Sequence, residues 1–151
     1  MADDRFIYVT YIRTTQEKLW AALKEPEFTR QYFFGVTMES EWTPDSAWRM
    51  VHPDGKVTDS GKVLEIDPPR RLVLSWRNEF MPELTAEGYS RATFELETQG
   101  DMVKLSVAHE IAKPGSKLIE AVSGGWPIIL SSLKSLLETG KPLERSASAK
   151  K

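Results

Sequence analysis

Short polar turns divide the middle of this sequence into segments of alternating apolar and polar residues. From residue 36 to residue 111 the segments have the two-residue period of β-strands. The turn signals between them are Pro44-Asp45, Pro53-Asp54-Gly55, Pro68-Pro69 and Gly100-Asp101. We expect six strands, at residues 36–42, 47–52, 57–67, 71–77, 89–99 and 102–111. Because such short connections cannot carry the crossover of a parallel pair, these strands should form an antiparallel meander.

Helices and one more strand are expected on either side of this meander. Residues 6–13 are rich in Ile, Val, Tyr and Thr and predict a strand. The sequence from Thr14 to Glu17 fits a capping box, so one or two short helices should follow it. Residues 117–139 predict a long helix, with a kink or a restart at Pro127, because apolar residues recur there at helical spacing: Leu118, Val122, Trp126, Ile129, Leu133 and Leu136. The prediction is an α+β fold in which about seven strands curve around the long C-terminal helix.

Composition limits the classes of protein that fit. With 151 residues, one domain is expected over residues 1–140, followed by a disordered tail at 141–151. The absence of cysteine excludes disulfides and thiolate metal sites. Charged residues of both signs are scattered along the chain and sum to −2, which argues against a nucleic-acid partner. The acidic N-terminus is unlike a signal peptide, and no apolar run reaches the ~20 residues of a membrane span. We therefore expect a cytoplasmic protein.

Several motifs carry a family resemblance. They are WTPDSAW at residues 42–48, GKVLEIDPPRRL at 61–72, LSW at 74–76, and GW at 125–126 followed by Leu130 and Leu133. In order and content they resemble the single-domain bacterial proteins of the activator of heat-shock-protein-90 ATPase homologue family, within the START-like (SRPBCC) superfamily. The resemblance spans residues 12–140 and implies a helix-grip fold of the START-like or Bet v-like type. The chain has no room for the separate N-terminal domain with which the eukaryotic activators stimulate the chaperone, so chaperone activation is not implied.

The resemblance also implies a ligand cavity between the sheet and the long helix. Large aromatic residues are available for its walls, although each of them could equally serve simple core packing. Phe80 and Met81 lie in a long loop and are candidates for a lid over the cavity mouth, with a plain surface loop as the alternative. The expected ligand-binding residues are Tyr32, Phe34, Trp48, Met50, Trp76, Phe80, Phe94, His109, Trp126 and Ile129.

Few polar residues are candidates for chemistry. Strand parity places His109 on the apolar face, where it either orients a ligand or is a core histidine bonded to backbone. His52 adjoins a turn and should be a solvated loop residue. A general base would require burial to raise the pKa of one of four carboxyl groups: Glu39, Glu41, Asp59 or Glu65. We assign no catalytic residue, no metal site and no cofactor, since two histidines without cysteines give no metal motif and no glycine-rich phosphate loop is present.

These observations favour a non-catalytic protein that binds a small hydrophobic or aromatic molecule. One alternative is a cyclase-, hydrolase- or isomerase-like enzyme that uses the same cavity, with His109 or a buried carboxyl group as acid or base. The other is a chaperone-related protein-interaction module with a filled cavity. A homodimer is compatible with the sequence, and a chaperone partner has no motif in its support.

Overall fold

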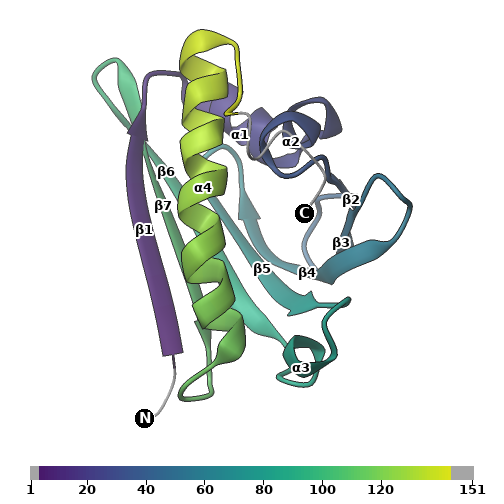
Figure 1. The fold of residues 1–151 in the computed structure, drawn as a ribbon. Coiled ribbons are helices and arrows are strands. Elements are labelled where there is room, and N and C mark those ends of the chain that lie inside the picture. Colours follow the sequence, from purple (N-terminus) through teal and green to yellow (C-terminus); the bar gives the residue numbers. More distant parts are fainter. Residues whose placement is uncertain (1–3, 144–151) are drawn as a thin grey trace.

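A single curved antiparallel sheet encloses one long helix in the computed structural model, which describes residues 4–143 (Figure 1). The order of the seven strands in this part of the chain is β1-β7-β6-β5-β4-β3-β2. In chain order the elements are β1 (Asp4–Ile12), α1 (Gln16–Lys24), α2 (Pro26–Tyr32), β2 (Thr37–Ser40), β3 (Ala47–Val51), β4 (Val57–Asp67), β5 (Arg71–Asn78), α3 (Pro82–Thr85), β6 (Ser90–Gln99), β7 (Met102–Ile111) and α4 (Lys117–Thr139). The predicted α+β helix-grip fold is confirmed.

The predicted elements differ from the observed ones mainly at their ends. The strand expected at residues 36–42 is only Thr37–Ser40, because the chain turns at Trp42, which has a positive φ of 55°. Both short helices after the first strand form, and Thr15 caps the first of them by accepting a hydrogen bond from the Lys18 backbone N–H. The one-turn helix α3 lies in a loop that the sequence left without structure.

The restart expected at Pro127 is wrong, because α4 continues through this residue. Trp126 and Ile129, on either side of Pro127, are buried in the core, and this packing outweighs the backbone hydrogen bond that proline cannot donate. The helix ends as predicted at Gly140, whose φ of 86° suits glycine. Of the tail predicted at 141–151, residues 144–151 lie outside the described residues, whereas Leu143 donates its backbone N–H to the Ser132 hydroxyl.

The concave face of the sheet forms the core together with α4. Side chains alternate as expected on β7, where Val103, Leu105, Val107 and His109 are all fully buried. On β3, the indole of Trp48 lies across the sheet and donates a hydrogen bond to the Ser75 carbonyl oxygen at 2.8 Å. A side chain at Gly61 would overlap that same carbonyl, so glycine is required where Trp48 crosses β4.

Within residues 4–143, no helix is long and apolar enough to cross a membrane.

Candidate functional site

An outer cavity of about 500 Å³ lies where the β3–β4 end of the sheet faces the segment after α2. Its size is within the range of small-molecule sites, roughly 300–1,000 Å³. A smaller inner cavity of about 150 Å³ lies between β5 and α4. The two cavities share Phe33, Met50 and Asp59 in their linings, so these three residues lie where the cavities adjoin.

Most of the walls of both cavities are apolar. The outer cavity is lined by Phe33, Phe34, Val36, Met50 and Phe80, with His52, Asp54, Lys56, Thr58 and Asp59 supplying its polar groups. The inner cavity adds Trp76, Asn78, Leu84, Leu118, Ala121, Val122, Gly125, Trp126 and Ile129. A mostly apolar lining with a few polar groups is typical of sites that bind small organic molecules.

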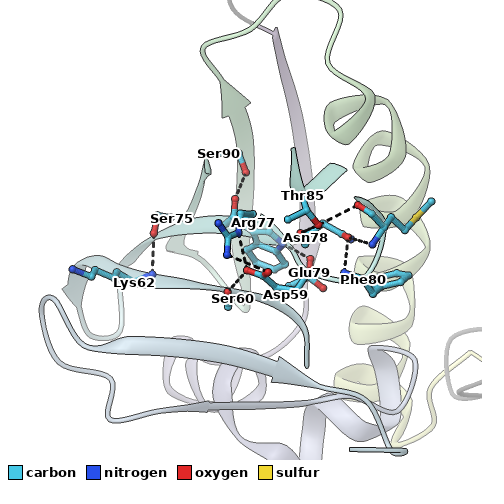
Figure 2. Close-up of polar contacts among 12 residues, drawn as sticks. Asp59, Ser60, Lys62, Ser75, Arg77, Asn78, Glu79, Phe80, Thr85 and Ser90 are labelled. Atoms are coloured by element: carbon cyan, nitrogen blue, oxygen red, sulfur yellow. Dashed lines mark hydrogen bonds and ion pairs between the residues drawn. The ribbon is translucent and has the colours of Figure 1, made fainter. Parts of the chain in front are cut away.

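Asp59 is the carboxyl group at the junction of the two cavities. The Trp76 indole N–H donates a hydrogen bond to its Oδ2 at 2.7 Å (Figure 2), and the Thr58 side chain also bonds to it. Burial raises the pKa of Asp59 to about 7, and the nearby charge of Glu79 acts in the same direction, while the two hydrogen bonds lower it only in part. Near neutral pH, Asp59 therefore exists in both its protonated and its ionised form.

The other three carboxyl groups considered from the sequence lie on the outside of the protein. Glu39 is exposed and pairs with Arg49 at 2.7 Å, and Glu65 is exposed and pairs with Arg71 at 2.9 Å. Glu41 is exposed as well. Of the four, only Asp59 is not exposed, and it lines both cavities.

Phe80 lies at the mouth of the outer cavity and is 57% exposed. Its loop is held by Asn78, whose side-chain oxygen accepts hydrogen bonds from the backbone N–H groups of Phe80 and Met81 at 3.1 and 2.9 Å (Figure 2). The Thr85 hydroxyl closes the loop by donating to the Asn78 carbonyl oxygen at 2.7 Å. Phe80 therefore lines the outer cavity from a hydrogen-bonded loop, while Met81 is exposed and is not among the lining residues.

His109 is fully buried and lies outside the linings of the two cavities. Its Nδ1 accepts a hydrogen bond from the Trp126 indole N–H at 3.2 Å. Because the Ser90 hydroxyl donates to the Trp76 carbonyl oxygen, it accepts from His109 Nε2 at 2.8 Å. Burial lowers the pKa of His109 to about 4, so the neutral ring joins β6, β7 and α4, and protein groups occupy both of its nitrogens.

The structure divides the remaining predicted site residues between cavity and core. Phe34 and Met50 line the outer cavity, and Met50, Trp76, Trp126 and Ile129 line the inner one. The others lie in the core beside them: Tyr32, whose hydroxyl donates to the Ala22 carbonyl oxygen at 2.8 Å, Trp48, whose ring is tilted against that of Trp76 with centres 4.6 Å apart, and Phe94, whose ring centre is 5.7 Å from that of Trp126.

The lining residues that were absent from the predicted site include Phe33, Asp59, Asn78 and Gly125. The alternation of side chains along β4 could have indicated that Asp59 points inward, because it shares a face of the strand with Gly61 and the buried Val63. His52, expected to be solvated, is half-buried and lines the outer cavity next to Asp54, 3.1 Å from its Oδ1. Among residues 4–143, no group of three His, Asp or Glu side chains could hold a metal ion.

The pH dependence of stability should reveal Asp59 and His109 separately, because they act in opposite directions. Folding lowers the pKa of His109, so this residue reduces the free energy of unfolding as the pH falls from about 6.5 to about 4. Folding raises the pKa of Asp59, so the stability that it contributes in acid is lost as the pH rises from about 4 to about 7.

The substitution Asp59→Asn should therefore steepen the rise in stability with pH and make the protein more stable than wild type above neutral pH. We expect a gain of about 2 kcal/mol, half of the full linkage value because Asp59 is partly exposed to water. Urea unfolding at several pH values measures this. Asp54→Asn, at the exposed mouth, is the control: the Lys56 backbone N–H lowers the pKa of Asp54, so this variant should keep the wild-type slope between about pH 5 and about pH 8. Equal slopes for wild type and Asp59→Asn would contradict the burial of this carboxyl group.

Comparison with known proteins gives a match to one protein family. A family model described as Activator of Hsp90 ATPase homolog 1-like protein matches residues 13–138. A search of curated proteins found no match.

Solved structures share the fold at low sequence identity. Protein MLL2253 from Mesorhizobium loti has a TM-score of 0.75 at 20% identity, over 89% of this chain and 96% of that one. The Aha1 dimer from Colwellia psychrerythraea has a TM-score of 0.73 at 17% identity, over 91% and 98%. DynU16, a putative protein in the dynemicin biosynthetic locus, has a TM-score of 0.74 at 21% identity, over 92% of this chain and 49% of that one. The family match covers most of the sequence, and this chain belongs to the Activator of Hsp90 ATPase homolog 1-like family.

Proposed function

We propose that this protein binds a small, largely apolar molecule in the two adjoining cavities between the sheet, the segment after α2 and α4. The observation that carries the proposal is the convergence of apolar walls on a single half-buried carboxyl group, that of Asp59. The apolar body of the ligand would contact Phe33 and Met50, and one polar group of the ligand would meet Asp59. Likeness to DynU16, from a biosynthetic locus, is compatible with a role in small-molecule chemistry.

Apolar burial would supply most of the affinity. Each buried methylene group contributes about 0.8 kcal/mol, and micromolar binding requires about 8 kcal/mol net. Binding should cost little entropy for ordering the loop that carries Phe80, because Asn78 and Thr85 already hold this loop by hydrogen bonds. The exposed ring of Phe80 would lose contact with water when a ligand fills the mouth beside it.

Acid–base catalysis in the same cavity is a second candidate function. The pKa of Asp59 near 7 supports it, because a group that titrates near the working pH can both accept and donate a proton. Within residues 4–143, Asp59 is hydrogen-bonded to the neutral side chains of Trp76 and Thr58 and to no second titratable group that could act as its acid–base partner. This is why binding is our first proposal.

A pair of glycine variants in α4 tests the binding function. Gly125 lines the inner cavity, and a Cβ placed there would lie 4.0 Å from Ile129 Cδ1. Gly125→Leu should fill the inner cavity and weaken binding of the neutral fluorophore N-phenylnaphthylamine by roughly tenfold or more, about 1.4 kcal/mol. Fluorescence titration measures the affinity, and native mass spectrometry of the purified protein shows whether a ligand is already bound.

The matched control is Gly124→Leu in the same helix turn, where a Cβ meets open space. Both variants replace a helical glycine by a better helix former, so neither should unfold α4. Gly124→Leu should bind as wild type does. Absence of binding to wild type, or equal binding by the two variants, would refute the proposed site.

We also propose that the protein forms a homodimer along the edge strand β1. Three alternate side chains on one face of β1 are exposed: Ile7 by 55%, Val9 by 43% and Tyr11 by 41%. An edge strand with exposed apolar side chains favours pairing with another chain. The similar structure from Colwellia psychrerythraea is that of a dimer, which supports a dimeric state here.

The dimer predicts a solution mass near twice the 17.2 kDa of one chain. Ile7→Lys should convert the protein to a monomer, because a charged side chain would be buried without a partner. Leu64→Lys, on the exposed face of β4, is the control and should remain dimeric. Analytical ultracentrifugation distinguishes the outcomes. A monomeric wild type at high protein concentration, or a dimeric Ile7→Lys, would exclude this interface.

A further inference from the structure

Asp59 is a cavity carboxyl group without a cation beside it. Among residues 4–143, no Lys, Arg or His side chain forms an ion pair with Asp59. The neighbouring carboxylate Glu79 differs, because it accepts hydrogen bonds from Arg77 Nε at 2.8 Å and from the Ser60 hydroxyl at 2.5 Å (Figure 2). A partly buried carboxylate that is bonded only to neutral donors lacks compensation for its charge.

Aromatic rings surround the space in front of Asp59. Phe33, Phe34 and Phe80 line the outer cavity, and the Phe33 ring lies edge-on to those of Phe34 and Trp126, at 6.5 and 5.8 Å. The face of an aromatic ring attracts a positive charge, more strongly when water is excluded. Aromatic walls and an uncompensated carboxylate together form a receptor for an organic cation.

The charged groups at the mouth do not supply this cation. Lys56 lines the outer cavity, but its side chain is exposed and makes no ion pair with Asp59. Asp54 is turned to its own loop, where it accepts a hydrogen bond from the Lys56 backbone N–H at 2.9 Å and contacts His52. An anionic ligand would meet the like charges of Asp54 and Asp59.

We infer that the ligand of this cavity is a small apolar or aromatic molecule that carries a protonated amine, with the ammonium group paired to Asp59. The inference rests on the proposed binding function and names the chemical class of the ligand. The ammonium N–H would donate to the carboxylate while the apolar body packs between Met50 and the phenylalanine rings. Neutral relatives of the same shape should bind less tightly, and carboxylic acids least.

The pairing requires the ionised form of Asp59. Because the pKa of this group is raised to about 7 by burial, amine affinity should increase from about pH 6 to about pH 8, while the amine itself stays protonated. Other titratable groups also act here, namely Glu79, whose charge acts on Asp59, and His52, Asp54 and Lys56 in the lining of the outer cavity. The Asp59→Asn variant is measured at the same pH values to separate their contribution, and its amine affinity should not show this rise.

Three probes of one shape test the inference: naphthylethylamine, naphthylethanol and the naphthylacetate anion. In calorimetric titrations at about pH 8, wild type should bind the amine roughly tenfold or more tightly than the alcohol, and the anion most weakly. Asp59→Asn should bind the amine no more tightly than the alcohol. Glu41→Gln, an exposed carboxyl group outside both cavities, is the control and should retain the preference for the amine.

The possible failures are distinguishable. If wild type binds the alcohol as tightly as the amine, the cavity binds ligands but the amine inference is overturned. If Asp59→Asn keeps the preference, Asp59 is not the partner of the ammonium group and the inference is again overturned. If none of the probes binds at millimolar concentration, both the inference and the proposed binding function fail.

Discussion

The indole of Trp76 joins the core of this protein to its cavity. The ring packs in an aromatic cluster, with its centre 4.6 Å from that of Trp48, 5.5 Å from that of His109 and 5.7 Å from that of Trp126. Its N–H is the donor that reaches Asp59. The position of that donor therefore depends on packing contributed by β3, β7 and α4, so the site is built on the sheet rather than on a mobile loop.

The cavity arises from where α4 lies on the sheet. In Figure 1 the helix runs beside β1 and over the strands next to it, while β2, β3 and the short helices lie on the other side of the molecule. The sheet curves away from α4 toward β4 and β3, and Phe33 and Met50 fill that space only in part. Burying Asp59 there disfavours its ionised form and so reduces the stability of the fold above neutral pH.

Local patterns predicted the elements and faces well, because strand alternation and turn residues act over a few positions. The parity of β7 correctly placed His109 inside, yet parity cannot show that Trp126 and Ser90, from α4 and β6, occupy its ring nitrogens. The sequence predicted a kink or a restart at Pro127. The burial of Trp126 and Ile129 favours a continuous helix, but it depends on strands that are distant in the sequence. Asp59 was one of four carboxyl candidates, and only the three-dimensional arrangement separates it from Glu39, Glu41 and Glu65, since desolvation depends on residues far away in the sequence.

The central claim is that Asp59 faces an apolar, water-poor cavity, and the titration of its carboxyl group tests this most directly. Carbon NMR of protein labelled at the aspartate carboxyl groups follows each group over a pH series, and Asp59→Asn assigns the signal. We predict a titration midpoint near 7 for Asp59. A midpoint near the ordinary aspartate value of about 3.9 would mean that water solvates this carboxyl group, and would contradict the account of the site.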